Sequence, residues 1–246
     1  MTDLQKHGHE VTALVRDDTR AETVAARGAK ASVVDLYDRS AVASLLRNLD
    51  GAIHTASPGD ATTADMDSAV ADAVIEAFAG TGKPYIEISG MWVYGDNTAI
   101  TEESAFHAPA LVAWKEPIER RVLGARGMRP VVVVSSTVYG DGGGAIPGAL
   151  LGSPRDDAGN LIMIGTGQQH WSTVHVADLA DFFRRVLEDD SARSAGRAPT
   201  PAETVVRTRF PRRAPARSSS RISRSTLHRA TWTPSRFSWS QTLRAP

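Results

Sequence analysis

The fold is decided by one stretch near the amino terminus, Gly8-His9-Glu10-Val11-Thr12-Ala13-Leu14-Val15-Arg16. Residues 11–15 are mostly apolar and rich in β-branched side chains, which predicts a short β-strand. A second run of this kind covers residues 31–36, and the polar, alanine-rich residues 17–28 between the two runs suit a short helix. The order strand, helix, strand indicates an α/β fold.

The same alternation continues along the chain. Apolar residues at helical spacing predict three further helices. The first begins after a Ser40 cap, the second covers residues 66–78 and the third covers residues 179–187. Short apolar runs predict strands at residues 52–56, 85–89 and 131–134, and the last run, four valines, indicates a strand buried on both faces. We therefore expect a doubly wound, mainly parallel sheet with helices on both sides.

Composition narrows the class of protein. With 246 residues and 41% hydrophobic side chains, the chain is long enough for one large domain. It has no cysteine, which excludes disulfides and thiolate ligands, and its histidines show no metal-binding spacing, so we expect no metal site. No apolar run approaches the roughly 20 residues that span a bilayer, and the first ten residues do not resemble a signal peptide. These features predict a cytoplasmic protein with no membrane partner.

The character of the chain changes after Asp190. Residues 191–246 contain twelve arginines and one acid, Glu203, and lack lysine and aspartate, whereas the preceding part is acidic. This composition predicts a disordered basic tail following a domain at residues 1–190. A basic arm for nucleic acid is one interpretation, but a carboxyl end read in a shifted frame fits the arginine, proline, serine and alanine content better. We expect no nucleic-acid partner, and the sequence indicates no oligomeric state.

Six phrases occur in an order that resembles the extended or atypical short-chain dehydrogenase/reductase superfamily, the NAD-dependent epimerase/dehydratase group. They are GHEVTALVR (8–16), VDL (34–36), AIHTAS (52–57), SGMWVYG (89–95), VYGDGGG (138–144) and WSTVHVADLA (171–180). The resemblance implies a Rossmann-like sheet that binds NADP or NAD. It also implies that a chain beginning at this point lacks the first strand, the glycine-rich phosphate loop and the following helix. The strands around Val11 and Ile53 would then lack the neighbour that pairs with both.

The resemblance further implies which residues bind the cofactor. These are Arg16, Asp35, Leu36, His54, Thr55, Ala56 and Lys115. An arginine at Arg16 suits the 2′-phosphate of NADP and slightly favours NADP over NAD, although an ordinary exposed arginine beside Asp17 is an equal alternative. Asp35 would contact adenine, or serve only as a turn residue. His54 is expected to contribute backbone and no catalytic group.

The catalytic signature departs from the family. Members that move hydride place a tyrosine four residues before a lysine, which lowers the phenol's pKa from about 10. Lys115 is suitably placed, but Leu111 stands where the tyrosine belongs, and Pro117 indicates a helix that begins near Lys115 and leaves Leu111 outside. The candidate catalytic residues are therefore Lys115 with Ser89, and a phenol from Tyr94 or Tyr139.

Two further stretches have structural interpretations. Residues 140–145 satisfy G-x-G-x-x-A, but Asp141 and Pro147 argue against a phosphate loop, and a glycine-rich loop near the nicotinamide and substrate fits better. His175 and Asp178 are expected to start the last helix rather than to do chemistry.

Three hypotheses about function follow. The first is an NAD(P)-dependent oxidoreductase or epimerase/dehydratase-like protein that acts on a small carbonyl, alcohol or sugar-nucleotide substrate. The second, suggested by Leu111, is a non-catalytic NAD(P)-binding or redox-sensing protein on the same fold. The third is an inactive, truncated or frame-shifted remnant with weak stability and weak dinucleotide affinity.

Overall fold

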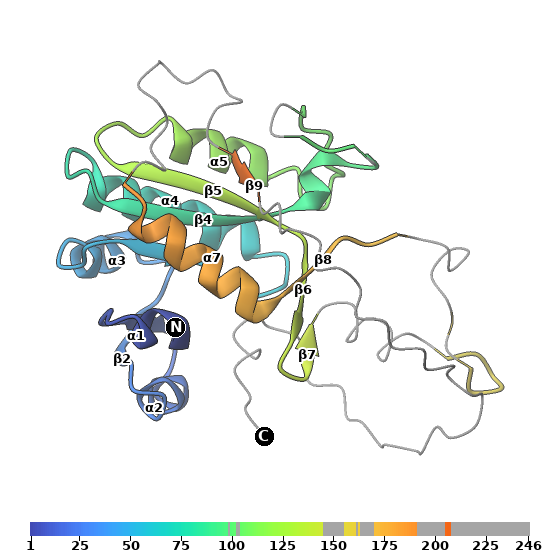
Figure 1. The fold of residues 1–246 in the computed structure, drawn as a ribbon, viewed down its shortest axis with the longest axis horizontal. Coiled ribbons are helices and arrows are strands. Elements are labelled where there is room, and N and C mark those ends of the chain that lie inside the picture. Colours follow the sequence, from blue (N-terminus) through green and yellow to red (C-terminus); the bar gives the residue numbers. More distant parts are fainter. Residues whose placement is uncertain are drawn as a thin grey trace.

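Parallel strands alternate with helices along most of the chain (Figure 1). The computed structural model describes residues 1–97, 99–101, 104–144, 155–160, 162, 170–190 and 205–207. The predicted α/β class with a Rossmann-like parallel sheet is confirmed.

The amino-terminal part forms a small unit of its own. Helix α1 (Thr2–Lys6), which the sequence analysis does not predict, leads into strand β1 (Thr12–Val15). Helix α2 (Asp18–Ala25) and strand β2 (Lys30–Val33) follow, in the predicted order of strand, helix and strand. Strands β1 and β2 pair in parallel over their whole length. Asp17 caps α2, because its Oδ1 accepts a hydrogen bond of 2.8 Å from the Arg20 N–H.

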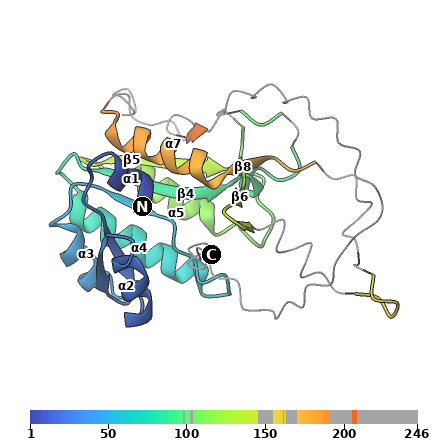
Figure 2. The same cartoon turned by 60° about the horizontal axis from the view of Figure 1, so that its bottom comes forward.

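A larger parallel sheet has the strand order β3-β4-β5-β9. Its members are β3 (Ala52–His54), β4 (Pro84–Gly90), β5 (Arg129–Ser135) and β9 (Val205–Arg207). Helices α3 (Arg39–Leu46), α4 (Thr63–Phe78) and α5 (Lys115–Leu123) cover one face, and α7 (Val176–Glu188) covers the other (Figure 2). Every residue of β5 is buried, as its valine run predicts.

The two faces of strand β4 carry different kinds of side chain. Ile86 and Ile88 point to the α7 side, where they join an apolar cluster that includes Phe183. Side chains alternate across a strand, so the polar residues of β4 point to the opposite face, toward α4 and α5. These are Tyr85, Glu87 and Ser89, and all three are buried. A polar stripe therefore runs along β4 in the interior of the protein.

The third sheet begins directly after β5. It consists of β6 (Thr137–Gly140), the short β7 (Gly143–Gly144) and β8 (Thr173–His175), in the order β7-β6-β8. Asp141 and Gly142 connect β6 to β7 with φ values of 50° and 76°, as in a type I′ hairpin turn. Residues 140–144 therefore turn a hairpin, whereas a phosphate loop leads from a strand into a helix. His175 caps α7 through its Nδ1, which accepts from the Ala177 N–H at 3.2 Å, as expected.

One local expectation is corrected. The helix expected to begin after a Ser40 cap starts earlier, because Asp38 is the cap and its Oδ1 accepts from the Ala41 N–H at 3.0 Å. In the predicted disordered tail, residues 205–207 form strand β9, which pairs in parallel with β5. The rest of the tail lies outside the described residues.

The two parallel sheets share no strand. Within the part of the chain that the structure describes, β1 pairs with β2 alone and β3 pairs with β4 alone. No helix among the described residues is long and apolar enough to cross a membrane.

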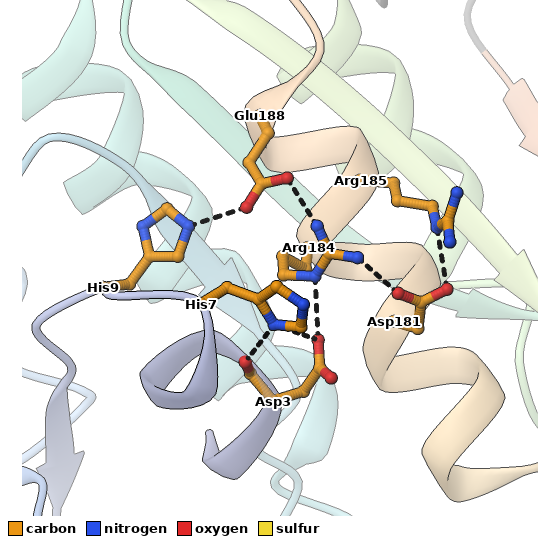
Figure 3. Close-up of polar contacts among 7 residues, drawn as sticks. All are labelled: Asp3, His7, His9, Asp181, Arg184, Arg185 and Glu188. Carbon is orange, nitrogen blue, oxygen red and sulfur yellow. Dashed lines mark hydrogen bonds and ion pairs between the residues drawn. The ribbon is translucent and has the colours of Figure 1, made fainter.

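Helix α1 is attached to α7 by a network of charges (Figure 3). The Arg184 guanidinium on α7 donates to Asp3 at 3.1 Å and to Glu188 at 2.6 Å, and it also binds Asp181. Glu188 in turn lies 2.9 Å from the His9 ring. Helix α1 and His9 are thereby held beside α7.

Candidate active site

The predicted cofactor residues follow successive parallel strands. Arg16 comes directly after β1, Asp35 and Leu36 follow β2, and Thr55 and Ala56 follow β3. Ligands of open α/β sheets bind at the carboxyl ends of the strands, which is where these residues lie.

Arg16 presents a charge to solvent at this edge. Its side chain is 62% exposed, and its Nε lies 3.3 Å from the Asp17 carboxylate. The backbone hydrogen bond from Arg20, together with Arg16 and Arg20 themselves, lowers the pKa of Asp17 against a smaller effect of burial. Most of the guanidinium remains open to solvent, so it can meet an anionic group.

The other residues predicted to bind the cofactor differ in solvent exposure and in their contacts. Asp35 accepts a hydrogen bond of 3.0 Å from the Tyr37 N–H, so it forms a turn at the end of β2, as one of the two interpretations expected. Leu36 and Ala56 are half-buried and pack against the apolar core beside α3 and α4. Thr55 is exposed. Apolar walls and one exposed hydroxyl thus lie at the carboxyl ends of β2 and β3.

Beneath this edge, four ionisable side chains meet in the interior. The Lys115 ammonium donates to Asp67 on α4 at 2.8 Å and to the Ile88 carbonyl on β4 at 3.0 Å. It also lies 3.5 Å from Glu87 Oε1, and His54 Nε2 lies 3.0 Å from the other oxygen of Asp67. An ammonium has three N–H groups, so these contacts satisfy Lys115. We refer to His54, Asp67, Glu87 and Lys115 as the buried ion cluster.

The charges of the buried ion cluster stabilise one another. Burial disfavours the charged form of Lys115, but the carboxylates of Glu87 and Asp67 outweigh it and raise the pKa of the lysine. Burial likewise opposes protonation of His54, yet its hydrogen bond with Asp67 and the charge of Glu87 raise the pKa of the imidazole. Burial also opposes ionisation of Asp67, but its hydrogen bond with His54 and the charge of Lys115 lower its pKa. The ion pair between Asp67 and Lys115 is therefore favoured in its charged form.

Two further acids border the cluster. The Tyr85 hydroxyl donates to Glu87, and burial together with the Glu87 charge raises the pKa of this phenol. Glu119 lies one helical turn after Lys115 on α5 and is 1% exposed. Burial raises the pKa of Glu119 to about 7, although the Ser89 hydroxyl and the Lys115 charge act in the opposite direction. Glu119 is the buried acid in this region that titrates near neutral pH.

The predicted catalytic residues do not come together on one surface. Helix α5 begins at Lys115, as predicted, and Leu111 lies before it with 70% of its surface exposed. Ser89 is buried behind the carboxyl end of β4, and Tyr94 is 1% exposed with its ring 5.5 Å from that of Phe106. Tyr139 is 44% exposed on β6. Of the two candidate phenols, Tyr139 is the one that a substrate can reach.

The sequence analysis missed Asp67, Glu87 and Glu119. Asp67 lies inside the apolar stripe of α4, where the pattern predicts only core residues. Glu87 alternates with apolar residues on β4, a pattern that normally indicates a side chain facing solvent. The potential ligand atoms of His54, Asp67 and Glu87 lie within 4.8 Å of one another, a grouping that can hold a metal ion. In this structure the Lys115 ammonium supplies the positive charge between the two carboxylates.

Three comparisons place the chain among known proteins. A protein of Schizosaccharomyces pombe named uncharacterized protein C2A9.02 is 29% identical over 197 residues, which cover 78% of this chain and 66% of that protein. The solved structure of DesIV, a dTDP-glucose 4,6-dehydratase from Streptomyces venezuelae with NAD bound, is similar with a TM-score of 0.56 and 18% identity. The match covers 74% of this chain and 63% of that one. UDP-glucose 4-epimerase from Thermotoga maritima gives a TM-score of 0.55 and 15% identity over 76% of this chain and 68% of that one.

The structural matches show a shared fold, and the chain spans less than two thirds of the length of DesIV and of the yeast protein. The model of the NAD dependent epimerase/dehydratase family matches residues 1–198. This match covers most of the chain, and the chain belongs to the NAD dependent epimerase/dehydratase family.

Proposed function

We propose that this chain is an NAD(P)-dependent oxidoreductase or epimerase/dehydratase-like protein that acts on a small carbonyl, alcohol or sugar-nucleotide substrate. The single observation that carries the proposal is the position of Lys115 in the first turn of α5, against the carboxyl-terminal half of β4. There its ammonium can keep its contact with Asp67 in the buried ion cluster and also bind a cofactor at the carboxyl ends of the strands.

The residues present fit two parts of a nicotinamide dinucleotide. The exposed Arg16 guanidinium suits a 2′-phosphate, and Leu36, Thr55 and Ala56 supply apolar walls and a hydroxyl at the carboxyl ends of β2 and β3. Lys115 would hold the nicotinamide ribose by exchanging its longest contact, to Glu87, for a ribose hydroxyl. The described residues contain no glycine-rich turn from strand to helix, so they supply no cradle of that kind for the pyrophosphate.

A bound nicotinamide supplies hydride transfer to or from the reacting carbon. In the proposal this chain's residues bind the substrate, orient it and handle the proton. Tyr139 is the reachable phenol and would exchange the proton with the substrate oxygen, although Gly143, and not a lysine, stands four residues after it. Ser89, buried behind Gly90, would act by fixing the end of β4, where the Ser135 hydroxyl donates to its carbonyl at 3.3 Å.

One observation favours a second function, a non-catalytic NAD(P)-binding or redox-sensing protein. Leu111 occupies the position of the family's tyrosine and lies outside α5, so no phenol accompanies Lys115 there. A protein of this kind would bind the cofactor without turnover.

Steady-state reduction of a panel of carbonyl compounds by NADPH and NADH distinguishes the two functions. The enzyme hypothesis expects turnover that Tyr139→Phe lowers at least tenfold and that Tyr94→Phe changes less. Saturable cofactor binding with no turnover of any compound would support the sensor instead.

Arg16 provides a separate test of cofactor choice. Arg16→Glu is expected to weaken NADPH binding by about 10-fold to 100-fold, because a charge-assisted hydrogen bond to the 2′-phosphate is lost and a repulsion is added. NADH binding should change much less, since NADH lacks that phosphate. Titration of both nucleotides with Arg20→Glu as a nearby control measures the difference, and an equal loss for both nucleotides would contradict the assignment.

A further inference from the structure

Two tryptophans from distant parts of the sequence meet on the surface. The rings of Trp92 and Trp171 have centroids 6.3 Å apart and planes inclined at 53°. Trp92 is 51% exposed and Trp171 is 48% exposed. Large aromatic side chains gain most of their stabilising free energy from burial, so two half-exposed tryptophans in contact leave apolar surface available to a ligand.

The pair lies at the edge of the sheet where substrates of this fold bind. Trp92 belongs to the short 3-10 helix Met91–Tyr94, which follows β4 without a break. Trp171 directly precedes Ser172, whose carbonyl accepts from the Thr137 N–H at 3.0 Å at the start of β6. Gly90 and Ser135 are paired at the carboxyl ends of β4 and β5, so both tryptophans stand just beyond these ends.

Polar contacts hold the two segments in place. The hydroxyls of Ser136 and Ser172 lie 2.6 Å apart, and the Ser136 hydroxyl also contacts the Met91 sulfur at 3.3 Å. Ser136 therefore joins the segment of Trp92 to the segment of Trp171. The exposed Tyr139 lies on β6, three residues after Ser136, and packs edge-on against His175 with ring centroids 5.3 Å apart.

The geometry of the pair limits what can bind. A ring placed between two parallel rings needs them about 7 Å apart, twice the usual contact distance of roughly 3.5 Å. The tryptophans are closer than this and tilted, so they form an angled shelf on whose outer faces a flat group can stack. The two serine hydroxyls beside the shelf already bind each other. A sugar ring needs several hydrogen-bond partners, whereas an aromatic ring needs an apolar face and few polar contacts.

We propose that Trp92 and Trp171 form a stacking shelf for the substrate, and that the substrate is a carbonyl compound or alcohol attached to a planar aromatic ring. This inference rests on the proposed function and selects one substrate class within it. The ring would lie on the shelf, and the reacting oxygen would point toward Tyr139.

Binding without cofactor tests the shelf independently of the oxidoreductase hypothesis. The probe is 2-naphthalenemethanol, titrated against the full chain and followed through the tryptophan indole N–H signals by NMR. Trp92→Ala and Trp171→Ala are each expected to weaken its binding by about fivefold to tenfold, the size of an aromatic stacking contact. Val33→Ala, which truncates an apolar side chain that is 51% exposed on β2, is the matched control and should leave the affinity unchanged.

Two comparison ligands make the outcome decisive. Decahydro-2-naphthalenemethanol has a similar size but no flat ring, and UDP-glucose represents a sugar nucleotide. The proposal expects both to be insensitive to the tryptophan substitutions and the saturated alcohol to bind more weakly than the aromatic one. Equal affinity for the two alcohols, an aromatic affinity unaffected by either substitution, or a UDP-glucose affinity that falls with both would overturn it. Loss of cofactor binding in a separate titration would count against the proposed function and leave the shelf standing.

Discussion

Replacing Lys115 with methionine is expected to destabilise the protein by about 3–5 kcal/mol, the usual consequence of removing one partner from a buried ion pair. Methionine keeps most of the side-chain volume, so the loss comes from charge rather than from a cavity. Asp67 and Glu87 would remain in the interior without the ammonium that lies 2.8 Å and 3.5 Å from them. Urea denaturation at pH 7 measures the free energy of unfolding.

Lys30→Met is the matched control. Lys30 pairs with Glu10 at 2.6 Å, but both side chains are largely exposed, at 70% and 82%, and exposed pairs contribute little to stability. The effect of Lys115→Met should also shrink at acid pH, since Asp67, whose pKa the charge of Lys115 helps to lower, can then bind a proton. A Lys115→Met protein as stable as the control would show that the buried ion cluster does not hold the helices to the sheet.

Glu119→Gln is expected to stabilise the protein at alkaline pH and to have little effect at acid pH. The folded-state pKa of Glu119 is raised to about 7 from 4.5, chiefly by burial. Between these two values the native state binds more protons than the unfolded state, so the contribution of Glu119 to the free energy of unfolding falls as pH rises. The stability of the natural protein relative to Glu119→Gln should fall by about 2 kcal/mol between pH 5 and pH 8.

Glu116→Gln is the control variant, because it removes the charge of a glutamate on the same helix that is less buried than Glu119. Glu116 lies on the same helix, is 34% exposed and pairs with Arg120 at 2.6 Å. Its substitution should give a difference in stability that varies little over the same pH range. If Glu119→Gln followed the natural protein in parallel from pH 5 to pH 8, Glu119 would not be the buried acid that titrates near neutral pH.

The sequence predicted the order of elements well because each has a local signal. Each signal lies within one short segment of the sequence, as for the apolar run at residues 11–15, the valine run of β5 and the apolar stripe of α4. The start of α5 was also predictable, since Pro117 is tolerated only in a helix's first turn. The cap at Asp38 was missed because Asp and Ser are equally good caps and stand two residues apart.

The candidate site was less predictable because it depends on contacts between distant segments. Asp67 and Lys115 are 48 positions apart, and nothing local indicates that an acid in an apolar helix stripe faces a lysine on another helix. The contact between Trp92 and Trp171 likewise joins two segments that are distant in the sequence, so no local pattern predicts it. Family resemblance indicated the edge of the sheet, but only the fold shows that Tyr139 is exposed and Tyr94 buried.

The central claim is that the carboxyl edge of these strands binds a nicotinamide dinucleotide. Its most direct test is a fluorescence or calorimetric titration of the full chain with NADPH. The account predicts saturable binding, weaker than micromolar because the described residues offer no glycine-rich cradle for the pyrophosphate, and competition by adenosine 2′,5′-bisphosphate through Arg16. A titration that shows no saturable binding up to millimolar NADPH would contradict it.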